Sequence, residues 1–276
     1  MTDVFHSPEA RAVIATTEAV NDEGWIVRRR ANPGARIRLF CFPYAGAGAW
    51  IYRAWSDLLP DLVEVCGVEL PGHGSRIHEP SCTRLVELAR QTAAGLRPYL
   101  DVPFAVFGHS IGGLLGFEFA RTLRREGSRF PNRLFVSAVA APHVQDRANR
   151  TDKVTDGELI RTLVELGGTP REILEDPELA DLFLPVVRAD LQLLETYGYV
   201  AEEALACPIS IFGGMDDPLT AREGLEAWRD QTSASFSFRQ FPGGHFFLNT
   251  QSDEFLRTLS EELERAANDC VREGRR

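Results

Sequence analysis

The sequence predicts an α/β protein with a mostly parallel central sheet that helices cover on both faces. From about residue 25 onward, apolar runs typical of strands alternate with segments of helical periodicity. The strand candidates are nearly continuous apolar runs, as expected when a parallel sheet is buried on both sides. With 276 residues, of which 44% are hydrophobic, the chain can bury one large core, so we expect a main domain over residues 25–267.

The first half of the domain follows this alternation closely. Residues 1–24 are polar and lack a strong apolar period, so we expect an N-terminal extension outside the core, with a short helix fitting residues 8–20. Strands are expected over residues 25–30, 37–42, 63–70, 104–108 and 133–140, and helices over 49–59, 84–99 and from just after residue 110 to about 126.

The alternation stops between about residues 142 and 206, where helical segments follow one another without a strand between them. Such an insertion is typical of a lid over the strand ends. The alternative is a set of surface helices unrelated to any site. We favour the lid because the insertion leaves the sheet at the same edge as Ser110, the candidate nucleophile that is discussed in the next paragraphs. Lid helices are expected over residues 156–166, 170–174 and 177–197, followed by strands over 208–212 and 235–241, helices over 222–231 and 251–267, and a flexible tail over 268–276.

Composition narrows the class of protein. The formal charge of −10 argues against general nucleic-acid binding. No segment approaches the roughly 18 apolar residues needed to span a bilayer, and no secretory signal is visible. The five cysteines are widely spaced and read as buried thiols, so we expect a cytoplasmic protein and, by default, a monomer. Neither a metal-ligand spacing nor a phosphate or dinucleotide loop is present, so we expect no metal and no cofactor.

Residues 104–114 carry the strongest chemical signal. Here an apolar strand stops at Gly108, and a helical pattern begins just after Ser110, which gives Gly108-His-Ser110-Ile-Gly112. A Gly-x-Ser-x-Gly segment between a strand and a helix is typical of a nucleophile elbow, in which the serine adopts a strained conformation and the glycines keep side chains out of the turn. The pattern therefore predicts an α/β-hydrolase fold with Ser110 as the nucleophile.

A serine hydroxyl needs a general base, and the base needs an acid to orient it. On this fold the chain order is serine, acid, histidine, which Ser110, the Asp216-Asp217 pair and His245 satisfy, each after a predicted strand. We choose Asp217 because it precedes a proline and is biased toward an extended conformation, whereas Asp216 is suited to capping the turn.

The remaining histidines have weaker claims on the chemistry. His109 belongs to the elbow and is expected to support it, and His73 is expected to make a loop contact. His143, at the start of the lid, is a weak candidate for lining the pocket.

The oxyanion that forms during hydrolysis needs two donors. One is expected to be the backbone amide of Ile111, directly after the serine. The other is expected from the glycine-rich loop after the 37–42 strand, where Ala45 is the best candidate and Gly46 and Gly48 allow close approach.

Six segments together resemble the type II thioesterases, stand-alone α/β-hydrolases that accompany polyketide and nonribosomal peptide synthetases. The resemblance covers about residues 25–263, and its most specific segments are the Phe-Pro-x-Ala-Gly loop and the Leu-Pro-x-x-Arg-x-Asp segment of the lid. The six segments are Phe-Pro-Tyr-Ala-Gly (42–46), Pro-Gly-His-Gly (71–74), Phe-Gly-His-Ser-Ile-Gly-Gly (107–113), Phe-Leu-Pro-Val-Val-Arg-Ala-Asp (183–190), Gly-Gly-Met-Asp-Asp-Pro (213–218) and Pro-Gly-Gly-His-Phe-Phe (242–247).

The resemblance implies the same triad of Ser110, Asp217 and His245 and the same oxyanion amides of Ala45 and Ile111. It further implies removal of misprimed or stalled acyl groups from the phosphopantetheine arm of acyl- or peptidyl-carrier proteins. Candidate docking arginines are residues 28–30 and residues 121, 124 and 125. An esterase, a lipase-like enzyme or an acyl-CoA thioesterase with the same triad is the alternative, since the triad does not select the substrate; a docking protein without activity is disfavoured by the complete triad.

Overall fold

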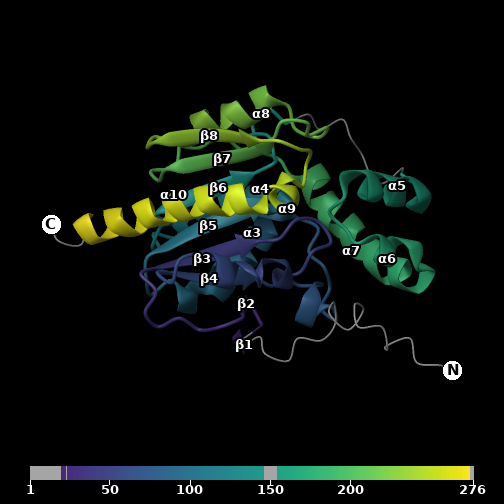
Figure 1. Ribbon diagram of the computed structural model, residues 1–276, viewed down its shortest axis with the longest axis horizontal. Helices are drawn as coiled ribbons and strands as arrows, with labels where there is room; N and C mark the ends of the chain where they lie inside the picture. Colours follow the sequence, from purple (N-terminus) through teal and green to yellow (C-terminus); the bar gives the residue numbers. More distant parts are fainter. Residues whose placement is uncertain (1–19, 23, 146–153, 274–276) are drawn as a thin grey trace.

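The computed structural model describes residues 20–22, 24–145 and 154–273. In these residues the strands form one eight-stranded sheet with the order β1-β2-β4-β3-β5-β6-β7-β8 (Figure 1). Strands β3 to β8 run parallel, and β1 and β2 add an antiparallel edge, so the α/β-hydrolase class that the sequence predicts is confirmed. The strands are β1 Val20–Asp22, β2 Ile26–Arg28, β3 Ile37–Phe42, β4 Val63–Val68, β5 Phe104–His109, β6 Arg133–Ser137, β7 Ile209–Gly214 and β8 Phe236–Phe241.

Side chains alternate between two cores along each central strand. In β5, Phe104 and Val106 face the core that α3 and α4 cover, whereas Ala105 and Phe107 face the core that α10 covers. Both faces are therefore apolar, which explains why the strand sequences are unbroken apolar runs. The helices are η2 Ala49–Tyr52, α2 Trp55–Leu58, η3 Gly74–Arg76, α3 Leu85–Leu96, η4 Arg97–Tyr99, α4 Ile111–Arg125, α5 Asp156–Leu166, α6 Arg171–Glu175, α7 Pro177–Thr196, α8 Arg222–Glu226, η6 Ala227–Gln231, α9 Phe247–Thr250 and α10 Ser252–Glu273.

The two ends of the chain differ from the expectation. Residues 20–22, expected in the extension, form β1 and pair with β2, while the helix expected over residues 8–20 lies almost wholly outside the described residues. Helix α10 continues to Glu273, so residues 268–273 are helical where a flexible tail was expected. None of the described helices is long and apolar enough to cross a membrane.

The inserted helices α5, α6 and α7 lie beyond one end of the sheet (Figure 1) and come between β6 and β7 in the chain. A capping box at Thr155 and Glu158 starts α5, and the Asp176 side chain caps α7, so these two helices have a local start signal. Helices α5 and α7 share a small core of their own, with Leu159, Ala180, Leu184 and Val187 buried in it. We call this segment, α5 to α7, the lid.

Candidate active site

Ser110 sits between β5 and α4 in a conformation that is rare for a residue with a side chain, with φ 55° and ψ −126°. Backbone hydrogen bonds hold it there, because its amide donates to Ser137 O at 2.7 Å and its carbonyl accepts from Gly113 N at 2.9 Å. A strained residue persists only where its surroundings determine its geometry. The conformation is that of a nucleophile elbow, as the glycine spacing predicts.

Glycine is required on both sides of Ser110 for steric reasons. A Cβ atom on Gly108 would overlap the Gly112 carbonyl, and one on Gly112 would overlap the Phe42 carbonyl and lie 2.5 Å from Pro43 O. The N-terminus of α4 is therefore packed against the end of β3. This contact places Ser110 beside the loop that follows β3.

We expect Gly112→Ala to destabilise the fold by about 1–3 kcal/mol, the usual cost of forcing an extra methyl into a packed site. The atoms that the methyl would meet are backbone atoms, which cannot rotate away. Gly157→Ala is the matched control, because its Cβ would meet nothing within 4 Å and alanine favours a helix. Urea unfolding of both variants measures the difference, and equal stability of Gly112→Ala and the wild type would contradict the packing described here.

Asp217 and His245 meet at the ends of neighbouring strands β7 and β8. The His245 Nδ1 and the Asp217 Oδ2 are 2.9 Å apart, and the side chains are 4% and 0% exposed, respectively. The other carboxylate oxygen, Oδ1, accepts from the Leu219 amide at 2.8 Å. Asp216, the alternative acid, is exposed, and its backbone amide donates to Gly243 O, while its side chain has no hydrogen-bond partner among the described residues. The structure therefore joins the histidine to the aspartate that the proline argument favours.

His109 links this pair to the elbow. Its ring centroid is 5.1 Å from that of His245, and its Nδ1 is 3.0 Å from Ser137 Oγ. Complete burial, with a smaller contribution from His245, lowers the pKa of His109 well below its usual value, so the ring is neutral and adds no fixed charge beside His245. As expected, this residue supports the elbow.

Among the described residues, the Ser110 hydroxyl has no hydrogen-bond partner. Contacts between a nucleophile and its base are often long without substrate and tighten when substrate binds. Because Asp217 occupies Nδ1, the Nε2 of His245 is the nitrogen left for proton transfer.

The loop after β3 forms a tight turn beside the elbow. Ala47 N donates to Tyr44 O at 3.0 Å, and Gly46 has φ 76°, as the third residue of a type II turn requires. Ala45 is the second residue of this turn. Because Phe42 pairs with Gly108 in the parallel register, the turn and the Ile111 amide lie at the same strand ends. Ile111 is the first residue of α4, where an amide has no partner within its helix.

Asp190 and His73 form a buried pair that the sequence analysis did not assign to the site. The Asp190 Oδ2 accepts from the Gly46 amide at 2.7 Å and lies 2.9 Å from His73 Nε2. Both residues are 3% exposed. Burial alone lowers the pKa of His73, but the hydrogen bond and the charge of Asp190 outweigh it, so the net shift is upward. His73 is therefore more than the loop contact expected of it.

Two aromatic rings connect the lid to the site. The Tyr44 hydroxyl donates to Gly168 O at 3.1 Å, and the Phe246 ring packs against the Cα of Gly168 in the turn between α5 and α6. The Tyr44 and Phe246 rings also meet edge to face, with centroids 4.8 Å apart. Since these rings neighbour Ala45 and His245 in the chain, the lid touches both sides of the site.

His143 lies elsewhere. Its Nδ1 is 2.9 Å from Gln231 Nε2, and its Nε2 is 3.4 Å from Asp230. The structure thus attaches it to η6, and the weak expectation that it lines the pocket gains no support.

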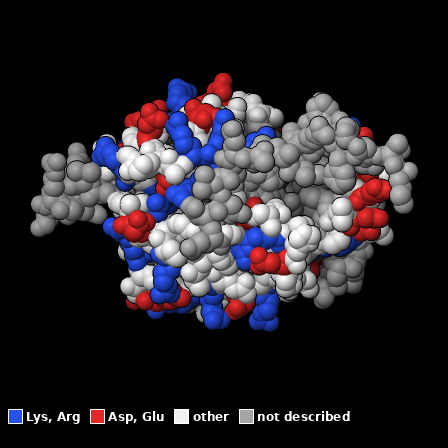
Figure 2. All heavy atoms as spheres, turned by 90° about the horizontal axis from the view of Figure 1, so that it is seen from below, with Lys and Arg blue, Asp and Glu red and all other residues white. Residues whose placement is uncertain are grey.

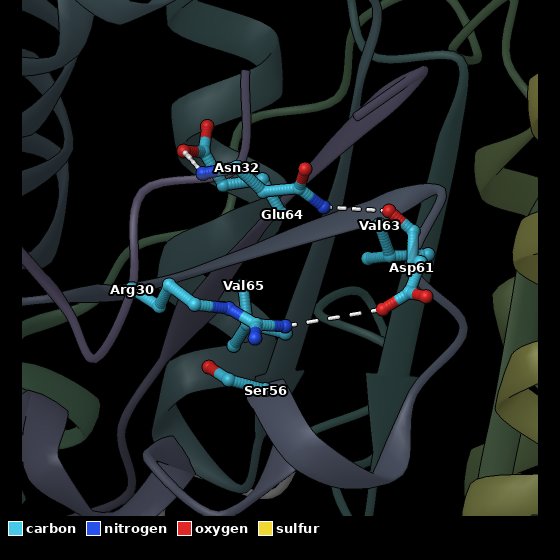
Figure 3. Close-up of a pocket in the computed structure, with 7 residues that line it drawn as sticks. All are labelled: Arg30, Asn32, Ser56, Asp61, Val63, Glu64 and Val65. Carbon is cyan, nitrogen blue, oxygen red and sulfur yellow. Dashed lines mark hydrogen bonds and ion pairs between the residues drawn. The ribbon is translucent and has the colours of Figure 1, made fainter. Parts of the chain in front are cut away.

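Figure 3 shows a small cavity beside the start of β4. Its volume is about 10 Å³, roughly enough for one water molecule. Asn32 is hydrogen-bonded there to Asp61 O and Glu64, and Arg30 pairs with Asp61. The cavity is too small for an acyl chain and carries none of the proposed chemistry.

The arginines suggested as docking residues all have acidic partners within the chain. Consistent with this, blue and red side chains are interspersed among the described residues on the face shown in Figure 2. Neither group forms a basic patch that is clear of acidic side chains. The ion pairs are Arg28–Glu64, Arg29–Asp57, Arg30–Asp61, Arg121–Glu118, Arg124–Glu202 and Arg125–Glu202.

This chain is similar to known proteins over most of its length. A family model described as the thioesterase domain matches residues 37–263. The gramicidin S biosynthesis protein GrsT of Aneurinibacillus migulanus is 38% identical over 239 residues, which cover 87% of this chain and 93% of GrsT. The solved structure of RedJ, a thioesterase from the prodiginine biosynthetic pathway in Streptomyces coelicolor, is 38% identical with a TM-score of 0.80 and covers 84% of this chain and 92% of RedJ. The structure of BorB, a type II thioesterase from the borrelidin biosynthetic cluster, is 35% identical with a TM-score of 0.80 and covers 88% of this chain and 98% of BorB.

Proposed function

Because this chain belongs to the thioesterase family, we propose that it is a serine thioesterase that releases acyl groups from the phosphopantetheine thiol of carrier proteins. The observation that carries the mechanism is the buried Asp217–His245 pair together with a serine held in the strained elbow conformation. The relatives named above belong to biosynthetic pathways, and BorB is a type II thioesterase. In that setting, the reaction removes misprimed or stalled acyl groups.

The first half of the proposed reaction transfers the acyl group to Ser110. The Ser110 Oγ attacks the thioester carbonyl carbon while His245 Nε2 takes the hydroxyl proton. The C–S bond then breaks, and the departing sulfur receives that proton as a free thiol. Asp217 holds His245 with its proton on Nδ1 and stabilises the imidazolium, since its Oδ2 faces that nitrogen at 2.9 Å.

The second half uses water in the same way. His245 takes a proton from water, the resulting hydroxide oxygen attacks the acyl-serine carbonyl, and the C–O bond to Ser110 breaks with return of the proton to Oγ. In both halves, the oxyanion is bound by the amides of Ile111 and Ala45. Each such donor is typically worth about 10²- to 10³-fold in kcat.

The lid and the family membership both support the proposal that the substrate is a carrier protein. A phosphopantetheine arm is long and thin, so a site that accepts it needs a channel under the lid rather than an open groove. The lid touches the site through Tyr44 and Phe246 and is therefore placed to shape the acyl pocket. The overall charge of −10 does not attract an acidic carrier protein, and the arginines above are engaged in ion pairs. Docking must therefore depend on local complementarity.

We expect an acyl-carrier protein to be hydrolysed with a higher kcat/KM than the matching acyl-CoA or 4-nitrophenyl ester. The carrier adds contacts outside the reacting atoms, and such binding energy can be used in the transition state. Release of the free acid over several chain lengths measures the ranking, with Ser110→Ala as the blank. A simple ester preferred over both thioesters would favour the esterase alternative, and acyl-CoA preferred over the carrier would favour an acyl-CoA thioesterase.

A further inference from the structure

The turn at residues 44–47 is held from the lid, by a side chain of α7. In a type II turn the central peptide, here between Ala45 and Gly46, is flipped relative to a type I turn. The Gly46 amide belongs to this peptide and donates to Asp190 Oδ2 at 2.7 Å. Its neighbour, the peptide that carries the Ala45 amide, is fixed by the 3.0 Å bond from Ala47 N to Tyr44 O. Asp190 thus holds the one peptide whose flip would change the type of the turn.

His73 fixes Asp190 in turn. Its Nε2 is 2.9 Å from Asp190 Oδ2, and its Nδ1 is 3.1 Å from Pro71 O. A carbonyl oxygen only accepts hydrogen bonds, so Nδ1 carries a proton and the ring is oriented by the backbone. The loop that presents His73 is itself held by buried Glu69, which accepts from Ala49 N at 3.2 Å and Ser75 N at 3.4 Å. The raised pKa of His73, described above, agrees with a ring that donates from both nitrogens.

The C-terminal end of α7, close to Asp190, is attached to the main domain, so the lid helix is a firm support for Asp190. Thr196 Oγ1 donates to Thr83 O at 2.8 Å, and the Tyr197 hydroxyl donates to Glu118 at 2.8 Å. Closer to the site, a Cβ on Gly46 would lie 2.7 Å from Val187 Cγ2, which shows that α7 lies directly on the turn.

Stability alone is a poor explanation for this arrangement. A buried ion pair is weak evidence for stability, because the cost of removing both charges from water often equals the attraction between them. What Asp190 supplies that an apolar residue cannot is an acceptor for the Gly46 amide in a fixed place. The function of Asp190 is therefore to orient the peptide that carries the Gly46 amide.

We propose that Asp190 and His73 are positioning residues that hold the 44–47 turn with the Ala45 amide directed at the oxyanion, so that a helix of the lid supports the catalytic machinery. This inference rests on the proposed function for the identity of the reaction. It goes beyond the triad in making transition-state binding depend on a carboxylate of the lid. The lid then does more than shape the acyl pocket.

The test is Asp190→Leu, which keeps the approximate size and shape of the side chain and removes its hydrogen-bond acceptor. We expect kcat to fall by roughly 10- to 100-fold, which does not exceed the fall in kcat that the loss of one oxyanion donor typically causes. We expect KM to stay within about twofold of the wild-type value, because the contacts to the bound substrate in its ground state are kept. Affinity for an acyl trifluoromethyl ketone, whose adduct with serine carries an oxyanion, should fall in parallel with kcat/KM. Asp181→Leu is the matched control, an exposed aspartate on the same helix, and should match the wild type.

A second pair of variants guards against a folding defect. His73→Gln retains a donor toward Asp190 and should lose less kcat than His73→Ala. Active sites are counted by end-point labelling with a fluorophosphonate, so that kcat refers to competent enzyme. Unchanged kcat in Asp190→Leu and His73→Ala, or a loss that disappears once active sites are counted, would overturn the proposal.

The two proposals fail in different ways. Should the wild type hydrolyse 4-nitrophenyl esters but no acyl-carrier protein, the proposed substrate is wrong, and the Asp190 variants still test the positioning role on the ester. Should the wild type hydrolyse the carrier thioester and Asp190→Leu do so equally well, the positioning role alone is wrong.

Discussion

Ser110→Ala is expected to lower kcat for acyl-thioester hydrolysis by at least about 10⁴-fold. The hydroxyl is the atom that attacks the carbonyl carbon, and without it only oxyanion binding and substrate positioning remain, which alone give a small residual rate over water. The fold should be retained, because the elbow is held by backbone hydrogen bonds from Ser110 N and to Ser110 O rather than by the side chain. Circular dichroism and urea unfolding check the fold, and steady-state release of the acid checks the rate.

Turnover by Ser110→Ala at a rate near that of the wild type would exclude an acyl-serine mechanism. A partial loss, of about tenfold, would contradict it as well, because attack on the carbonyl has no substitute in the described site. The variant also blocks labelling by a fluorophosphonate, which gives an independent measure of the same nucleophile.

Asp217→Asn is expected to lower kcat by about 10⁴-fold, the loss typical of an acid that fixes the tautomer of its histidine. The structure gives a specific reason. The Leu219 amide donates to Oδ1 at 2.8 Å, so an asparagine would place its carbonyl oxygen there and its NH₂ group toward His245. That histidine would then carry its proton on Nε2, where it cannot act as the base for Ser110.

Asp216→Asn is the matched control for this prediction. Asp216 is the neighbouring aspartate, is exposed, and makes no contact with His245 among those found in the described structure, so its replacement should change kcat by no more than about twofold. Equal losses in the two variants, or a larger loss in Asp216→Asn, would show that the acid has been assigned to the wrong residue.

Much of the fold was predictable because it follows from local patterns. Unbroken apolar runs predicted the parallel strands, and Thr155 and Asp176 stand where lid helices begin. Edges were harder. Strand β1 is short and pairs with β2, a contact that no apolar periodicity predicts. The polar sequence after residue 267 gave no sign that α10 continues to Glu273.

The chemical residues were predictable for a different reason. The elbow requires glycine at fixed spacing around Ser110, and the strand order brings an acid and a histidine to the same edge. The choice between Asp216 and Asp217 depended on Pro218, on the capping role open to Asp216 and on the resemblance, and the structure joins the residue before this proline to His245. Their catalytic roles, like those of the Ala45 and Ile111 amides, stay predictions for the experiments above.

The Asp190–His73 pair escaped prediction because it is a purely tertiary contact. The two residues are 117 positions apart in the sequence, and no local sequence pattern around either of them predicts the contact. The segment Leu184–Asp190 was singled out only by resemblance. In the structure Arg188 pairs with Asp156 of α5, whereas Asp190 accepts a hydrogen bond from the turn after β3. The two charged residues of the segment therefore make their contacts on opposite sides of α7.

The most direct test of the account is the time course of acyl release from a purified acyl-carrier protein, followed by intact-mass spectrometry of the carrier. With catalytic amounts of wild-type enzyme, we predict complete conversion of acyl-phosphopantetheine to the free thiol over many turnovers. The matched sample with Ser110→Ala should stay at the rate without enzyme. Failure of the wild type to release the acyl group from a range of acyl-carrier proteins, while it hydrolyses a simple ester through Ser110, would contradict the central claim.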